Sequence, residues 1–472
     1  MAEAADRLHA IDALWLEMEG DGPPIAIGTV AVCDGPVPGD DELLTMLADR
    51  IERMPRLHQG LSDRGSGLRR PVWVEARGWE LADHVHHLDA TPSGAHPGLA
   101  AAVSHIMAQP LLVDRPLWDM WVVDGLADEP EGGLADEPEG RWALVWRVHH
   151  TVVDGVGALT LLGHGFDVAP SGGQSLAEAV LTASTGAPAQ QPSPTTPDRE
   201  PGRRSGLAAG FGDALGALRD AAPHIVPAAV ALVPHPPSPL AGRVGDGRTW
   251  ISVDVPLADV KIVGRAFGAT VNEVVLALVT AGFRDLLVAR GEPVSGRVVR
   301  NLVPVSMRPP GDGSAHNKVS AMLGNLPVGV ADPVERLHAA RHEVEHGREA
   351  GTPLLGSLLL DLVDRTVPAG VQDVAVASAG RYAPAWFIDT LTTNVPGPQF
   401  PVYLCGRRVA AMYPLIPVAG HTCITTGIFS YDGTLNIGVT GDADQAGDVD
   451  VLARGIARAA DELMDRVGER RA

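Results

Sequence analysis

One polar, proline-rich segment divides the chain and most constrains its fold. Residues 185–206, TGAPAQQPSPTTPDREPGRRSG, replace the apolar periodicity of both flanks with Pro, Gln, Thr and charged residues. Such a segment buries too little apolar surface to order itself, so we expect an exposed, flexible linker. Because 472 residues exceed what one core usually organises, we expect a first domain at 1–184 and a second at 246–472, with an apolar connecting segment at 207–245.

Apolar spacing predicts both helices and strands in each half. Helices are expected at residues 39–54, 98–109 and 268–291. Strands are expected at 26–35, 118–126, 296–308, 387–397 and 424–443. Neither half shows a regular βαβ alternation, so the predicted fold class is α/β in the broad sense (α+β), with mixed sheets.

Two connections are predicted from local sequence. Asp432-Gly433 lies between alternating runs and predicts a tight hairpin turn, since such turns need positive φ. The octapeptide GLADEPEG occurs at 125–132 and again at 133–140, between two strand-like runs. We expect the duplication to lengthen an exposed hairpin loop, which costs little because loop-closure entropy grows slowly with length.

Composition excludes several classes of function. Acidic residues outnumber basic ones, 58 against 37, for a formal net charge of −21, which argues against nucleic acid as a partner. The three cysteines have no CxxC spacing, so neither a disulfide framework nor a zinc site is indicated. The histidines at 84, 86 and 87 lack partnering ligands for a metal and are expected to pack or lie at the surface.

The N-terminus has no basic region followed by an apolar one, so we expect no secretory signal. No run reaches the roughly 18 apolar residues that span a bilayer. We therefore expect a cytoplasmic protein. Residues 206–233 are apolar and could either lie on a lipid surface or pack under a neighbouring domain.

The stretch RWALVWRVHHTVVDGVG, residues 141–157, carries the strongest chemical signal. A histidine at a strand end that faces a cleft has a pKa near neutrality and can accept a proton from a hydroxyl or amine. Successive strand side chains point to opposite faces, so only one of His149 and His150 faces a given cleft. Asp154 either orients the base or pairs with a distant arginine, and Gly155 allows a sharp turn. The alternative is a strand end that happens to carry two histidines and an ordinary turn.

HHTVVDG matches the HHxxxDG motif of the CoA-dependent acyltransferase superfamily. Further segments in order make the chain resemble the bacterial wax ester synthase/diacylglycerol acyltransferases within it, from about residue 8 to about residue 465. These segments are LHAIDALWLEMEG, the PLW of DRPLWDMWVVDGL, GATVNEVVLA, VPVSMR, GNLPV, NVPGP and SYDG.

The resemblance implies two domains similar to chloramphenicol acetyltransferase, with an active-site tunnel between them. It implies that the second histidine, His150, is the general base, that no cofactor is needed, and that acyl-CoA is a co-substrate. It also implies that Asp154 points away from substrate and pairs with an arginine, for which Arg308 is the candidate. His149 and Asp154 are then expected to hold His150 in place.

Three further segments carry candidate supporting residues. Asn272 matches the first member of the family's Asn-Asp pair, while Glu273 replaces the usual aspartate, so acceptor positioning is less certain. The alternative for both is a helix N-terminal turn whose polar side chains satisfy free backbone N–H groups. Pro116, Leu117 and Trp118 shape a channel entrance or simply pack, and Asn394 lies in the rigid NVPGP turn.

The resemblance implies an O-acyltransferase that moves a long-chain acyl group from acyl-CoA to diacylglycerol or a fatty alcohol. Two alternatives stay open: a condensation-type or polyketide-associated acyltransferase that uses a carrier-protein thioester, and a lipid-binding protein that keeps the fold without turnover. The predicted partners are acyl-CoA and a lipid alcohol, with peripheral contact to a membrane or lipid droplet. The oligomeric state is left open.

Overall fold

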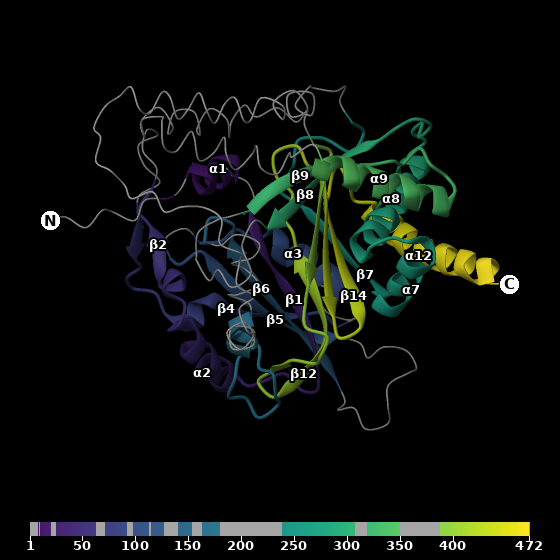
Figure 1. Cartoon of the computed structure of the whole chain (residues 1–472). Helices are drawn as coiled ribbons and strands as arrows, with labels where there is room; N and C mark the ends of the chain where they lie inside the picture. The colour runs from purple at the N-terminus through teal and green to yellow at the C-terminus, as the bar shows by residue number, and fades with distance from the viewer. Residues whose placement is uncertain are drawn as a thin grey trace, which may run out of the picture.

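The computed structural model (Figure 1) is built on two six-stranded β-sheets. The residues that it describes are 8, 10–19, 25–62, 71–91, 98–112, 115–126, 140–152, 163–179, 238–306, 319–349 and 388–471.

The first sheet has the strand order β11-β12-β1-β6-β5-β4. Its strands are β1 (Ala26–Asp34), β4 (Val85–Asp89), β5 (Trp118–Leu126), β6 (Arg141–His149), β11 (Tyr403–Leu404) and β12 (Arg407–Leu415). β4 and β5 are parallel, whereas the other pairs are antiparallel. The antiparallel pairing of β5 with β6 agrees with the predicted hairpin across the duplicated octapeptide, most of which lies outside the described residues.

The second sheet has the order β7-β14-β13-β10-β8-β9. Its strands are β7 (Arg248–Pro256), β8 (Val299–Ser306), β9 (Val319–Leu326), β10 (Thr390–Pro396), β13 (Ile424–Tyr431) and β14 (Thr434–Asp442). β10 is parallel to both β8 and β13, and the remaining pairs are antiparallel. Both sheets are therefore mixed, and the predicted α/β (α+β) class with mixed sheets is confirmed. A small separate hairpin pairs β2 (Gln59–Leu61) with β3 (Trp73–Glu75).

The two sheets do not divide at one point of the chain. β11 and β12 come from the C-terminal half but complete the first sheet, where β12 pairs with β1 from Gly28↔Leu415 to Cys33↔Val409. The range 246–472, predicted as a second domain, therefore contains two strands of the first sheet. This could not be predicted from the sequence, because periodicity predicts a strand and not its partner.

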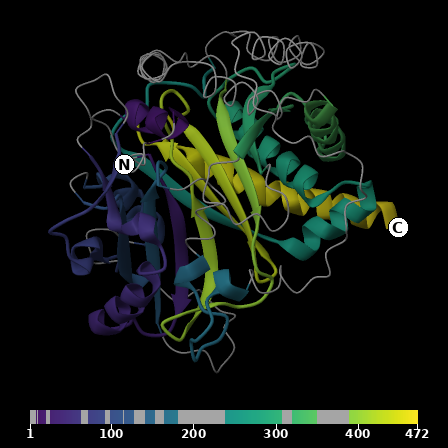
Figure 2. The ribbon, with the colours of Figure 1, turned by 60° about the vertical axis from the view of Figure 1, so that its left-hand side comes forward.

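Helices cover both faces of the first sheet and one face of the second. α2 (Asp40–Ile51) packs on the face of the sheet that carries Trp146 of β6. α3 (Leu99–Ala108) packs on the opposite face, which carries the neighbouring residue Val145, because successive strand side chains alternate between faces. α7 (Leu257–Phe267), α8 (Val271–Ala289), α9 (Pro333–Glu349) and α12 (Val449–Arg471) lie against the second sheet. Figure 2 shows its strands between the N-terminal elements and these helices. Short 3-10 helices are η1 (Pro55–His58) and η2 (Leu81–His84).

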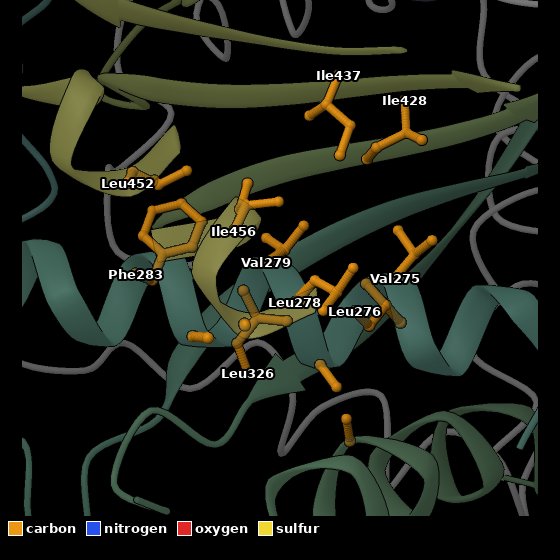
Figure 3. Close-up of a cluster of buried hydrophobic side chains, with 14 of the residues drawn as sticks. Val275, Leu276, Leu278, Val279, Phe283, Leu326, Ile428, Ile437, Leu452 and Ile456 are labelled. Carbon is orange, nitrogen blue, oxygen red and sulfur yellow. The ribbon is translucent and has the colours of Figure 1, made fainter. Parts of the chain in front are cut away.

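The core of the second half forms around α8. Val279 and Phe283 of α8 face Ile437 of the sheet and Leu452 and Ile456 of α12 (Figure 3). α8 and α12 approach closely because glycines meet there: a Cβ at Gly282 would lie 2.6 Å from the carbonyl oxygen of Leu452. This close contact fixes α8 against α12.

The predicted turn at the last hairpin is confirmed. Tyr431 pairs with Thr434, and the two residues between them, Asp432 and Gly433, have φ of 42° and 88°. Positive φ at both central residues is the geometry that Asp-Gly favours in a two-residue hairpin.

No single helix of the described residues is long and apolar enough to cross a membrane. α7 and α8 pass a test of length and composition only when taken as a pair, and they are bent by 104° relative to each other.

Candidate active site

β6 carries the two motif histidines to its end, inside the first sheet between β1 and β5. The backbone there is held from both sides. The N–H of His149 donates to the carbonyl of Leu117 and the N–H of His150 donates to the carbonyl of Ile25, each at 2.9 Å. The end of the strand therefore presents both side chains from a fixed backbone.

His149 is 1% exposed and uses both ring nitrogens. Its Nδ1 accepts from the backbone N–H of Thr151 at 3.1 Å, with the Thr151 hydroxyl at 2.8 Å. Because a backbone N–H only donates, Nδ1 carries a lone pair and Nε2 carries the proton. That proton points to the carboxylate of Glu19, the last residue of α1 (Ala10–Glu19). His149 thus joins α1 to the strand end.

His150 has a different environment. Its ring is half-buried and stacks on the indole of Trp15, with ring centroids 4.4 Å apart and an interplanar angle of 25°. Of the two histidines, His150 is the one that keeps part of its side chain exposed. Its role as general base stays a prediction.

Three of the predicted site residues lie outside the described residues. These are Asp154, Gly155 and Arg308. The ion pair between Asp154 and Arg308 therefore stays a prediction from the resemblance.

The structure brings two predicted residues of the second half together. Asn272 in the first turn of α8 accepts a hydrogen bond from the amide of Asn394 in β10, at 3.1 Å between Oδ1 and Nδ2. Their separation of 122 residues gave no indication of this contact. The pair links the start of α8 to the end of β10.

Glu273 has a structural position. It is 4% exposed, and its carboxylate accepts from the backbone N–H of Thr270 at 2.9 Å, while its own N–H donates to the Thr270 hydroxyl at 3.3 Å. This reciprocal arrangement is a capping box, in which Glu is favoured at this position. The alternative of a helix N-terminal turn therefore describes Glu273, whose carboxylate is engaged by the helix cap.

The PLW residues are packed. Pro116, Leu117 and Trp118 are all buried, and the Trp118 indole donates to the carbonyl of Leu57 at 3.0 Å. The Trp118 ring stacks on His84 with centroids 4.3 Å apart. The packing alternative describes all three residues within the described structure.

The histidine group at 84–87 also packs or lies at the surface, as predicted. His84 is buried, and its Nδ1–H donates to the carbonyl of Trp118 at 2.7 Å. Burial lowers the pKa of His84 from its ordinary value. His86 packs beside the Trp121 ring, and exposed His87 pairs with Asp40. No three His, Cys, Asp or Glu side chains gather for a metal among the residues that the structure describes.

Sequence reasoning missed two residues that touch the motif. Glu19 and Trp15 lie in the N-terminal segment used for the resemblance, but neither was identified as part of the site. Their spacing of four on a helix places them on one side of it. That spacing was the only indication in the sequence that the two residues act at one place. It points to the motif only when α1 is known to lie beside the end of β6.

Two models of one protein family match most of the chain. The wax ester synthase/diacylglycerol acyltransferase catalytic-domain model matches residues 8–275, and the C-terminal domain model of the same family matches residues 315–464. The probable diacylglycerol O-acyltransferase tgs1 of Mycobacterium tuberculosis is 32% identical over 469 residues, which cover 97% of this chain and 96% of the relative. A putative diacylglycerol O-acyltransferase of Mycobacterium bovis is also 32% identical over 469 residues, with the same coverage of both chains.

Solved structures share the fold. The wax ester synthase/diacylglycerol acyltransferase of Marinobacter aquaeolei has a TM-score of 0.65 and 22% identity, covering 98% of this chain and 99% of that one. The first condensation domain of the CDA synthetase has a TM-score of 0.56 and 18% identity, covering 98% and 97%. With the motif, the two family models and relatives along almost its whole length, the chain belongs to the wax ester synthase/diacylglycerol acyltransferase family and is an acyltransferase.

Proposed function

We propose that the chain transfers a long-chain acyl group from acyl-CoA to the hydroxyl of diacylglycerol or a fatty alcohol, giving triacylglycerol or a wax ester. The observation that carries the proposal is the match of the family's catalytic-domain model to residues 8–275, a range that contains HHTVVDG. Relatives named diacylglycerol O-acyltransferases along 97% of the chain support diacylglycerol as an acceptor.

His150 supplies the acid-base chemistry in this proposal. Its imidazole takes the proton of the acceptor hydroxyl as that oxygen attacks the thioester carbonyl. The tetrahedral intermediate then collapses, the C–S bond breaks, and the proton returns to the CoA sulfur. The acyl group moves directly to the acceptor, so no covalent acyl-enzyme and no cofactor are required. A positioned general base contributes roughly two to four orders of magnitude in rate.

His149 supports this step without exchanging protons itself. Both of its ring nitrogens are engaged, by Thr151 and by Glu19. Its ring therefore fixes the backbone from which His150 projects. This division of roles matches the expectation that two adjacent histidines do not share one function.

The acceptors are lipids, so the protein must reach them in a membrane or droplet surface. We infer peripheral contact, for which apolar residues 206–233 are the sequence candidate. These residues lie outside the described ones, and the tunnel between the domains stays a prediction. The inference therefore rests on the chemistry of the substrates and on the sequence.

The test is thiol release from palmitoyl-CoA in the presence of diolein or hexadecanol, with the lipid product identified by mass spectrometry. Burial raises the pKa of Cys405 and Cys423 to about 11, so the protein's own thiols add little background at neutral pH. We expect His150→Ala to lose about 100-fold or more in kcat because it removes the base, while the variant keeps a cooperative thermal transition even though its stack on Trp15 is lost. Vesicles that carry the diolein, recovered by flotation, report lipid contact in the same assay.

Three results would contradict the proposal. Full turnover by His150→Ala would exclude it as the base. Release of thiol only with a carrier-protein thioester or with an amine acceptor would favour the condensation-type alternative, and absence of turnover with every acceptor would favour the lipid-binding one.

A further inference from the structure

We propose that Trp15 is a positioning residue of the acyl-transfer site, which holds the imidazole of His150 in its working orientation. The inference rests on the proposed function, because it needs His150 as the base. Trp15 and Glu19 lie four residues apart on α1 and therefore on one side of the helix. They contact consecutive residues of the motif: Trp15 stacks on His150, and Glu19 binds His149.

α1 is fixed where this contact needs it. Ala13 of α1 and Leu8 before it pack with Leu117 and Trp73 in one buried cluster. The carbonyl of Leu117 in turn accepts the backbone N–H of His149. Leu117 thus packs in the same cluster as α1, which carries Trp15, and is hydrogen-bonded to the end of β6, which carries the histidines. This shared residue couples the position of α1 to that of the strand end.

The stack restrains His150 without competing for its proton. The indole covers one face of the imidazole, at 4.4 Å and 25°, and the stack does not occupy the ring edge, where the imidazole nitrogens lie. The indole N–H is a donor only and accepts no proton at neutral pH. Trp15 therefore acts through His150 and not on the reacting atoms.

The aromatic face is the part of Trp15 that the site uses. Its Nε1 is buried and has no hydrogen-bond partner among the described residues. Within the described residues, loss of that N–H therefore removes no hydrogen bond, and a phenyl ring at this position can still stack on the imidazole. This predicts different outcomes for Trp15→Phe and Trp15→Ala.

The experiment compares Trp15→Ala and Trp15→Phe with Leu16→Ala, each measured for kcat, KM for palmitoyl-CoA and melting temperature. Leu16 also packs from α1 against the buried cluster and controls for loss of helix packing. We expect Trp15→Ala to lower kcat by about 10- to 100-fold, as for a misplaced catalytic group. Its KM should stay within about twofold, and Trp15→Phe should recover kcat to within about threefold of the wild type. Leu16→Ala should lower the melting temperature more than it lowers kcat.

Three outcomes would overturn the inference: a kcat of Trp15→Ala close to the wild type, a Trp15→Phe as slow as Trp15→Ala, or losses of kcat that follow melting temperature equally in Trp15→Ala and Leu16→Ala. His150→Ala, measured alongside, separates the two proposals. Turnover by His150→Ala contradicts the proposed function. Loss in His150→Ala with none in Trp15→Ala contradicts only the role of Trp15.

Discussion

At the scale of single residues, different surroundings distinguish the two identical side chains of His149 and His150. His149 is surrounded by a backbone donor and a carboxylate, which fix one tautomer, whereas His150 lies against an aromatic face. Neither difference is visible in the sequence HH. The motif supplies the residue types, and partners from α1 give the two histidines different surroundings.

His84 gives a residue-scale prediction on pH. Burial lowers its pKa, so it stays neutral in the folded protein while the unfolded chain takes up a proton below its ordinary value near 6.5. Its contribution to stability is therefore present above pH of about 6.5 and lost as the pH falls through the folded-state pKa. Its Nε2 is buried without a partner in the described structure, so a proton there gains no bond.

We expect His84→Phe to be less stable than the wild type at pH 8, because the bond to the Trp118 carbonyl is lost. The difference between the urea unfolding midpoints of the wild type and His84→Phe should become smaller toward pH 5, because only the wild type loses the contribution of His84. His87→Gln, an exposed position on β4, is the matched control and should show no narrowing. A gap for His84→Phe that stays constant with pH would show that burial in the fold does not lower the pKa of His84.

At the scale of elements, α8 begins where its capping box dictates. A Thr-x-x-Glu sequence at residues 270–273 satisfies two backbone N–H groups reciprocally. This explains the departure from the family's Asn-Asp pair: the longer Glu273 side chain reaches back to the cap, and Asn272 is left to bind Asn394. The sequence predicted the helix and named the capping alternative, but could not choose between capping and substrate contact.

Two buried threonine hydroxyls of the second sheet differ in their hydrogen bonding, which gives a prediction at the scale of elements. Thr390 and Thr426 are both 0% exposed, on the neighbouring strands β10 and β13. The Thr390 hydroxyl donates to the carbonyl of Ile424 at 2.9 Å, whereas the Thr426 hydroxyl has no partner in the described structure. A buried hydroxyl without a partner lowers stability because its hydration is lost without replacement.

We expect Thr426→Val to raise the free energy of unfolding by about 1 kcal/mol and Thr390→Val to lower it by about 1 kcal/mol. Guanidinium unfolding followed by circular dichroism measures both. Equal destabilisation by the two substitutions would mean that an ordered water satisfies Thr426, and the distinction would be wrong.

At the scale of the whole molecule, β12 joins the two sheets. It is hydrogen-bonded into the first sheet beside β1, while its Pro414 lies against the facing pair Gly427 and Gly438 of the second. Any side chain at either glycine would collide: a Cβ at Gly438 would lie 2.6 Å from the Pro414 carbonyl oxygen. The two halves are therefore parts of one packed unit, although the sequence suggests two separable domains.

This arrangement predicts that residues 1–245 do not fold correctly alone. Without β11 and β12, the edge of β1 exposes unpaired backbone groups and apolar surface, which promotes aggregation. We expect the fragment to be mostly insoluble, and a version with residues 400–418 attached through a flexible linker to be recovered in a larger soluble fraction. A soluble, monomeric 1–245 fragment with a cooperative thermal transition would contradict the role given to β12.

The sequence by itself determined the local features of this protein. Periodicity and turn chemistry, which act over a few residues, predicted the helices α2, α3 and α8, the strands β1, β5, β8, β10, β13 and β14, the Asp432-Gly433 turn and a strand that ends in two histidines. The other described helices and strands were not predicted. The tertiary structure alone decided which distant partners meet. Glu19 reaches His149 across 130 residues, and β12 reaches β1 across more than 370, because such contacts depend on how buried faces match in space. That matching leaves no periodic trace along the chain.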